Sequence, residues 1–213
     1  MASPYSYIAF EGPLGCEKRS LARLVAKELE AELTPDLVEN PFLWDFYKNR
    51  NGAAFQAQLF FLLNRFQLLQ GLRQPNLFRQ TIVTDFIIEK DRIYAYQNLS
   101  DSELALYEKL YPMLTADQVA PDLVVYLQMS PEKVLENLRK RKEIKQFNIS
   151  PEYIENVVEA YNRFFFHYEA SPLIIINANH VNFSKDRAAI NDLLEYFKKT
   201  LRGVTYFTPQ IPG

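Results

Sequence analysis

A glycine-containing stretch near the N-terminus has the spacing of a phosphate-binding loop. The Walker A form of that loop is glycine, four residues of any type, glycine, lysine and then serine or threonine. Gly12, Gly15 and Lys18 fit it, whereas Glu17 stands at the second motif glycine and Arg19 at the hydroxyl residue. Glu17 puts a negative side chain where backbone N–H groups close around phosphate oxygens. Arg19 removes the oxygen that would hold magnesium, so the residues indicate a phosphate loop altered at two positions.

The sequence on either side of this loop supports its place in an α/β fold. The apolar run Tyr7–Phe10 precedes it, and Ser20–Leu29 follows with apolar residues at helical spacing. A strand, a glycine-containing turn and a helix are the setting that the motif requires. We therefore predict a phosphate-binding loop over residues 11–20. An ordinary turn between strand and helix that binds no nucleotide is the alternative interpretation.

Composition indicates one domain without specialised charge or metal chemistry. The chain has 213 residues, of which 48% are hydrophobic, enough for a sizeable core. The 24 basic and 26 acidic residues give a net charge of −2, which argues against a nucleic-acid partner. One cysteine excludes an intramolecular disulfide, and with only two histidines we expect no zinc-type metal site.

Neither a membrane nor a secretory route is expected. No apolar run approaches the roughly 20 residues needed to cross a bilayer. The N-terminus lacks the charged and then apolar order of a signal peptide. We therefore expect a cytoplasmic protein without a membrane partner.

Strand-like and helical segments alternate along the chain. Continuous apolar runs predict strands at Tyr7–Phe10, Thr81–Thr84, Leu123–Leu127 and Leu173–Asn177, with a weaker one at Glu32–Val38. Helices are predicted over Arg19–Glu30, Ala53–Arg73, Ser102–Tyr111, Pro131–Lys142, Pro151–Tyr168 and Lys185–Leu201. This order predicts a single α/β domain over residues 1–213, with a parallel five-stranded sheet between layers of helices. No element is predicted over residues 203–213.

Three acids lie at or beyond predicted strand ends: Glu39, Asp85 and Asp91. Ligands of a parallel sheet bind at the carboxyl ends of its strands. A carboxylate there could act as a general base toward a hydroxyl group or help to hold magnesium. The alternative is that these acids only cap helices or occupy their first turns.

Together these segments resemble the deoxynucleoside kinases, particularly the bacterial deoxyadenosine/deoxyguanosine kinases. The resemblance runs from Tyr7 to about Phe183 and rests on four further segments: residues 39–44 (Glu-Asn-Pro-Phe-Leu-Trp), 55–66, 84–92 and 160–168. It implies a P-loop kinase fold, ATP and Mg²⁺ as requirements of an active enzyme, a purine deoxynucleoside as substrate, and a homodimer.

The resemblance also implies roles for individual residues. Glu39 would be the base for the nucleoside 5′-hydroxyl, and Asp85 would belong to the catalytic acidic motif. Gln58, Arg65 and Asp91 would bind the nucleoside, with the first two at base-recognition positions, and Tyr47 would meet the sugar 3′-hydroxyl. Gln58 and Arg65 are seven residues apart, so they would equally suit a solvated or dimer-facing helix stripe. Phe42, Trp44, Phe60 and Phe61 could line a pocket for the base or belong to the core.

The lid predicted at about residues 137–150 departs from the family pattern. The family presents arginines there at a spacing like Arg-x-x-x-Arg-x-Arg, and this chain has Asn137, Arg141 and Glu143. Of these three lid residues, only Arg141 is then expected to bind phosphate. Where the family has a sugar-binding glutamate followed by glutamine and glycine, residues 146–148 are Gln146, Phe147 and Asn148.

Three hypotheses about the function of the protein follow from these departures. An arginine at the transferred phosphoryl group contributes about 10³ to 10⁵ in rate, so we expect a weak or inactive kinase that acts by binding a nucleoside or a partner, with no cofactor if inactive. The alternative is an active kinase that transfers the γ-phosphate of ATP to a deoxynucleoside 5′-hydroxyl. Ser20 could then supply the metal ligand, or Arg19 could reach a phosphate. The third is an interaction module that uses residues 164–168 as a subunit interface.

Overall fold

A parallel sheet carries the fold. The computed structural model describes residues 3–36, 39–72, 81–141, 147, 149–181, 183 and 186–208. Within these residues six parallel strands run in the order β2-β3-β1-β4-β5-β6. They are β1 (Tyr7–Glu11), β2 (Glu32–Thr34), β3 (Ile82–Thr84), β4 (Leu123–Gln128), β5 (Leu173–Asn177) and β6 (Val204–Phe207). The order reverses at β1, which lies between β3 and β4, and in open α/β sheets such a point is where ligands bind.

The strand count corrects the sequence-based expectation. All five predicted strands are present, β2 as a shorter segment than expected, but the prediction of five strands was wrong by one. The additional strand, β6, pairs with β5 at the edge of the sheet. Val204 and Tyr206 on it are exposed and Phe207 is buried. An edge strand of this kind has no continuous apolar run, which was the pattern used to find the others.

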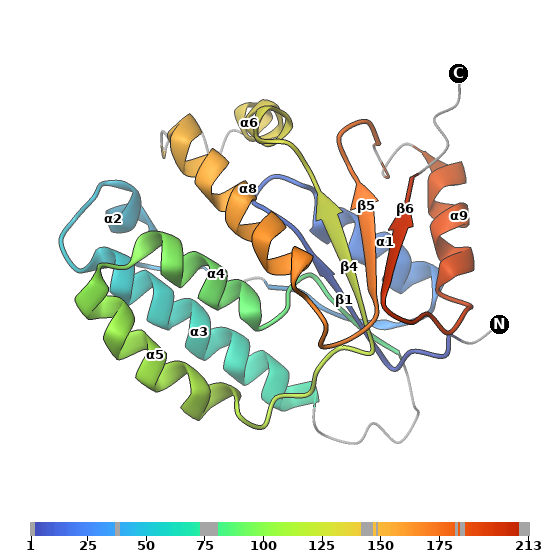
Figure 1. Ribbon diagram of the computed structural model, residues 1–213, viewed down its shortest axis with the longest axis horizontal. Helices are drawn as coiled ribbons and strands as arrows, with labels where there is room; N and C mark the ends of the chain where they lie inside the picture. The colour runs from blue at the N-terminus through green and yellow to red at the C-terminus, as the bar shows by residue number, and fades with distance from the viewer. Residues whose placement is uncertain are drawn as a thin grey trace.

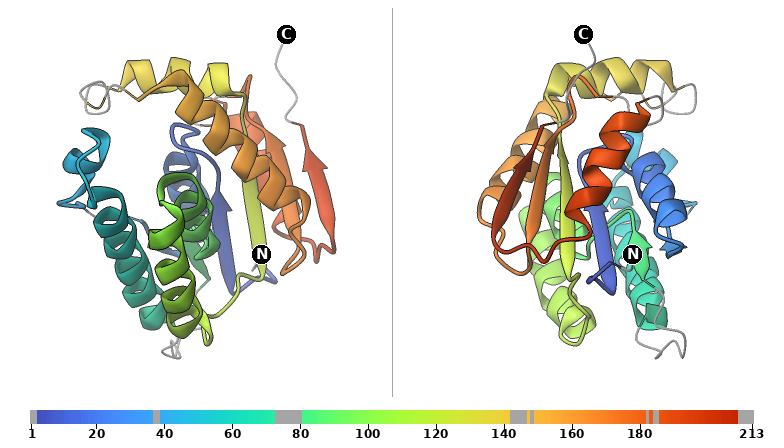
Figure 2. Two further views of the ribbon diagram at one scale, coloured as in Figure 1. Left: turned by 60° about the vertical axis from the view of Figure 1, so that its left-hand side comes forward. Right: turned by 90° about the vertical axis from the view of Figure 1, so that its right-hand side faces the viewer.

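Helices cover both faces of the sheet. They are α1 (Lys18–Glu28), α2 (Leu43–Tyr47), α3 (Ala53–Leu72), α4 (Glu89–Asn98), α5 (Asp101–Thr115), α6 (Pro131–Lys140), α8 (Pro151–Phe166) and α9 (Arg187–Tyr196). Helices α8 and α9 lie on opposite faces of the sheet, and α2, α3 and α5 extend beyond it (Figures 1 and 2). Neither the short α2 nor α4 was predicted. For α4 the reason is that its first turn, Glu89–Arg92, is charged and shows no apolar periodicity.

Successive side chains of each strand point to opposite faces of the sheet, and this divides the core into two parts. On β1, Ile8 and Phe10 pack with α1 and α9, whereas Tyr7 and Ala9 pack with α4 and α8. A strand buried on both faces gives the continuous apolar run that the sequence shows. The three-layer α/β architecture predicted from the sequence is therefore confirmed. Within the described ranges, no helix is both long and apolar enough to cross a membrane.

Candidate functional site

The loop between β1 and α1 packs so closely against neighbouring atoms that Gly12 leaves no room for a side chain. A Cβ added at Gly12 would lie 2.7 Å from Cys16 Sγ and 2.8 Å from the Leu127 carbonyl oxygen. Glu17 adopts a left-handed conformation, with φ 62° and ψ 18°, directly before α1 begins at Lys18. Glycine reaches this region readily, whereas other residues are strained there. The glutamate at the motif glycine is therefore accommodated in a backbone shape that suits glycine.

The loop lysine is already neutralised by an acid of this chain. Lys18 Nζ donates to the carboxylate of Glu11 and, at 2.6 Å, to the Gly12 carbonyl oxygen. Glu11 is fully buried and also accepts from Gly12 N (2.8 Å), Ile87 N (3.2 Å) and Tyr161 Oη (3.3 Å). Burial alone would lower the pKa of Lys18, but the Glu11 charge raises it. Sequence reasoning missed Glu11, although an acid ending an apolar strand one residue before Gly12 was a visible signal.

Arg19 forms an ion pair with Asp85, the acid that follows β3. Its Nε donates to Asp85 Oδ2 at 2.7 Å, and its Nη2 donates to the Asp36 carbonyl oxygen at 2.8 Å. The other carboxylate oxygen of Asp85 accepts from Asp36 N at 2.5 Å. Ser20 is exposed and lines a different cavity from Arg19. With α1 beginning at Lys18, the register shift that would bring Ser20 to a metal is not adopted.

A first cavity of about 210 Å³ lies among α2, α3, α4 and α8. The predicted residues Tyr47, Gln58 and Arg65 line it, and so do Arg19, Asp36, Phe61 and Lys90. Tyr47 stacks on Phe147 with ring centroids 4.6 Å apart, which brings a residue of the predicted lid to the cavity wall. Of the four aromatics considered from the sequence, only Phe61 lines this cavity; Phe42 and Phe60 contact each other, and Trp44 contacts Phe147.

A buried polar network lies behind the wall of this cavity, and of its members Asp91 and Tyr107 are fully buried and do not line the cavity itself. Arg65 donates through Nη1 to Asp91 and through Nη2 to Asp36 Oδ2 at 3.0 Å. Gln58 Nε2 donates to Asp91 Oδ1 at 2.7 Å, and Tyr107 Oη donates to the same oxygen at 2.9 Å. Four of these side chains were brought together from helices α3, α4 and α5. The predicted residues Gln58, Arg65 and Asp91 therefore form one connected unit.

Asp36, rather than Glu39, is the acid at this cavity. Lys90 Nζ lies 2.7 Å from Asp36 Oδ2. Burial would raise the pKa of Asp36, but the charges of Lys90 and Arg65 outweigh it and hold that pKa well below its usual range. Glu39 is exposed and is not among the residues that line the cavity. The missed signal was the place of Asp36, two residues after β2 at the carboxyl edge of the sheet.

A second cavity of about 490 Å³ lies on the other side of the loop. It is bounded by the loop, by α6 and by the segment after β5, and its polar lining includes Ser20, Lys133, Asn137, Lys140 and His180. Asn137 Nδ2 donates to the Gly15 carbonyl oxygen at 3.1 Å, so a residue of the predicted lid is tied to the loop. Arg141 directly follows the last residue of α6, is partly buried and lines neither cavity. Glu143, Gln146 and Asn148 lie outside the described residues.

The residues around the loop do not fit a magnesium site. Asp85 is held by Arg19, and Glu11 is held by Lys18 and three further donors. Asp36 and Asp91 each accept from Arg65 and from at least one other side chain. Magnesium needs oxygen ligands that are free to face it. In the part of the chain that the structure describes, no group of three or more candidate metal ligands occurs.

Comparisons with known proteins agree with this fold. The family model for deoxynucleoside kinase matches residues 8–202. The chain is 32% identical to a deoxyguanosine kinase of Bacillus subtilis (strain 168) over 157 residues, covering 73% of this chain and 76% of that one. It is 26% identical to a deoxyadenosine kinase of Lactobacillus acidophilus, covering 92% and 97%. A solved structure of deoxyadenosine kinase from M. mycoides with bound dATP superposes with a TM-score of 0.77 at 22% identity, covering 91% and 100%.

The parallel sheet, its central β1 and the glycine-containing loop that leads into α1 define a P-loop α/β protein of the kinase type. Within that class, the chain belongs to the deoxynucleoside kinase family. The resemblance inferred from the sequence is therefore confirmed.

Proposed function

We propose that this family member binds a deoxynucleoside in the first cavity and transfers phosphate weakly or not at all. The observation that carries this proposal is that two cations of the loop, Lys18 and Arg19, are both paired with acids of the chain itself. A P-loop acts by presenting positive charge and backbone N–H groups to phosphate oxygens. A nucleotide must compete with Glu11 for Lys18 and must share Arg19 with Asp85, which weakens phosphate transfer.

The buried network supports nucleoside binding. A purine base offers adjacent donors and acceptors, and the carboxamide of Gln58 can satisfy both kinds. Its Nε2 is oriented by Asp91, while its Oε1 has no donor among the described residues. Two of the relatives named above are a deoxyguanosine kinase and a deoxyadenosine kinase, which favours a purine deoxynucleoside.

Deoxynucleoside binding tests this proposal directly. We expect deoxyadenosine or deoxyguanosine to raise the melting temperature of the purified protein and to release heat on titration. Gln58→Leu should abolish both effects, because the apolar side chain leaves the base edge unpaired. Gln67→Leu is the matched control, since Gln67 is an exposed glutamine on the same helix. If none of the four deoxynucleosides binds, the proposal is wrong.

Residual kinase activity is the second candidate, and the place of Asp36 in the cavity favours it. In that reaction the nucleoside 5′-oxygen attacks the γ-phosphorus of ATP, its proton passes to the Asp36 carboxylate, and ADP leaves. Asp36 lines the cavity, whereas Glu39 does not. The low pKa of Asp36 makes it a weak base, which agrees with slow transfer.

Chromatography of nucleoside monophosphate after incubation with ATP and each deoxynucleoside tests this second candidate. We expect any product to disappear in Asp36→Asn and to persist in Glu39→Gln. Product lost only in Glu39→Gln would instead restore the base predicted from the sequence. Absence of product from folded protein that still binds deoxynucleoside would leave the binding function alone.

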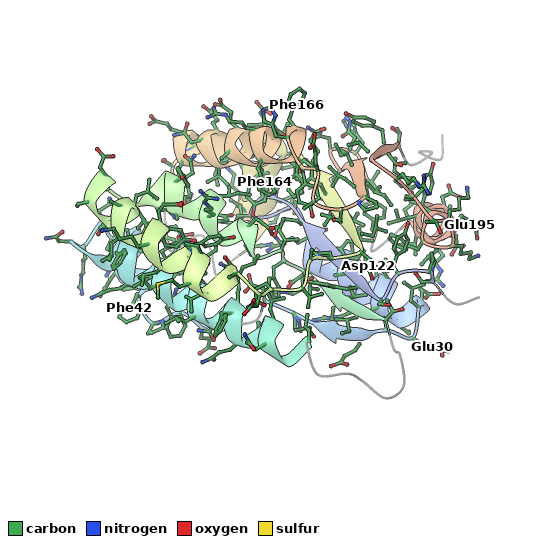
Figure 3. The ribbon with its side chains drawn as sticks, turned by 60° about the horizontal axis from the view of Figure 1, so that its bottom comes forward. Glu30, Phe42, Asp122, Phe164, Phe166 and Glu195 are labelled. Carbon is green, nitrogen blue, oxygen red and sulfur yellow. The ribbon has the colours of Figure 1, made fainter. Side chains whose placement is uncertain are left out.

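We also propose that the chain forms a homodimer through the surface between α4 and α8. This α4–α8 surface comprises Tyr96, Phe164, His167 and their neighbours around a cavity of about 590 Å³. Phe164 lines this cavity, whereas Phe166, which is 83% exposed, projects from the other side of α8 and does not line it (Figure 3). Exposed aromatics that gather on one face indicate an interaction site. A cytoplasmic location stays a prediction.

A further inference from the structure

Arg19 stands where a P-loop protein has the hydroxyl residue that ligates a divalent cation. Its side chain reaches the ends of two strands, because Nε donates to Asp85, directly after β3, and Nη2 donates to the carbonyl oxygen of Asp36, two residues after β2. The guanidinium thus bridges two strand ends beside the loop. A positive charge is fixed at the junction of the loop and the first cavity, which Arg19 also lines.

The same contacts withdraw Asp85 from metal binding. Asp85 is 1% exposed, and each of its carboxylate oxygens already accepts a hydrogen bond, one from Arg19 and one from Asp36 N. A metal ion at this acid would have to displace Arg19 and then lie next to its charge. The other acid near the loop, Glu11, accepts from Lys18 and from three further donors.

Arg19 retains the means to bind phosphate. Its side chain is 43% exposed, and among the described residues Nη1 has no acceptor. A guanidinium carries its charge at every working pH and presents a planar fork of donors that matches phosphate oxygens. It also needs no ion from solution, in contrast to a loop that recruits magnesium through a serine or threonine.

We propose that Arg19 takes over the charge-neutralising role of the divalent cation, so that this loop binds the polyphosphate of a nucleotide without magnesium. This inference rests on the proposed function only in that it places a nucleotide at the loop. The inference concerns binding of the phosphate donor at the loop, whereas the proposed function concerns binding of the nucleoside in the first cavity.

Calorimetric titration with ATP, once in EDTA and once in excess magnesium chloride, tests the proposal on the wild-type protein. We expect a dissociation constant in EDTA that is equal to or lower than the one in magnesium. In Arg19→Thr, which restores the hydroxyl, the constant in EDTA should rise about tenfold, and magnesium should now tighten binding. Arg23→Thr, an exposed arginine one turn further along α1, should change either constant less than about twofold.

The wild-type comparison decides the matter even if Arg19→Thr fails to fold. Tighter binding of ATP in magnesium than in EDTA would overturn the proposal, and so would the absence of ATP binding in both. Arg19→Lys, which keeps the charge but loses the fork, should retain binding in EDTA at lower affinity. Deoxynucleoside binding, measured separately without ATP, distinguishes failure of this inference from failure of the proposed function.

Discussion

Charged residues at the loop pair with each other rather than standing open to a ligand. Lys18 and Glu11 form one pair, and Arg19 and Asp85 form another. Truncating one partner of a buried pair leaves an uncompensated charge. The departure at Arg19 therefore contributes to the stability of the protein as well as to its site.

Glu17 is the other departure from the motif. Among the described residues its side chain has no hydrogen-bond partner, and its backbone adopts the strained left-handed conformation. We expect Glu17→Gly to stabilise the protein by about 0.5–1 kcal/mol, since relief of the left-handed conformation exceeds the added entropy of the unfolded chain. Urea unfolding followed by circular dichroism measures this change.

The control for Glu17→Gly is Glu155→Gly, at an exposed position within α8. Glycine there should destabilise the protein by about 1 kcal/mol. If both substitutions destabilise it to a similar extent, the left-handed backbone at Glu17 contributes no strain.

At the scale of elements, β1, the loop and α1 form one closely packed unit with β4. Gly12 leaves no room for a side chain between Cys16 and Leu127. Gly15 is similarly close to Leu138 of α6, with a Cβ 3.0 Å from Leu138 Cδ2. The shape of the loop is therefore determined by the strand and helix that flank it as well as by its own residues.

Gly12→Ala should destabilise the protein by about 1–3 kcal/mol, because the added methyl group overlaps Cys16 Sγ and a backbone oxygen that cannot move freely. Gly71→Ala is the matched control, since Gly71 lies in α3 with open space around it. Alanine there should be neutral or stabilising by up to about 1 kcal/mol. Thermal unfolding of both variants gives the comparison, and equal melting temperatures would contradict the packing argument.

At the scale of the whole molecule, the sheet separates two apolar cores while the α4–α8 surface leaves aromatics exposed. Tyr96, which lines the cavity of this surface, is 53% exposed. The protein has a chain mass of 24.9 kDa, so a dimer is easily distinguished from a monomer by light scattering.

We expect the wild-type protein to scatter light as a particle of twice the chain mass, and Tyr96→Glu to shift it toward the monomer, because a buried charge without a partner is unfavourable at an interface. Met113→Glu is the control, as Met113 is 77% exposed on α5, away from this surface. A monomeric wild type, or equal dissociation in both variants, would contradict the proposed interface.

The chain by itself determined the architecture. Buried parallel strands need apolar residues on both faces, so Tyr7–Phe10, Leu123–Leu127 and Leu173–Asn177 were visible as runs, and the amphipathic helices followed from their spacing. The sequence also gave the altered loop, and it identified Gln58, Arg65 and Asp91, which the structure joins in one network.

Only the tertiary structure decided what the charges do. Glu11 meets Lys18 within the turn of the loop, but Arg19 meets Asp85, and Asp36 meets Arg65 and Lys90, across distances of tens of residues in the chain. Ion pairs depend on where side chains converge at the strand ends, which local patterns of polarity do not encode. For the same reason β6 and α4 were missed: their places depend on neighbouring elements more than on their own residues.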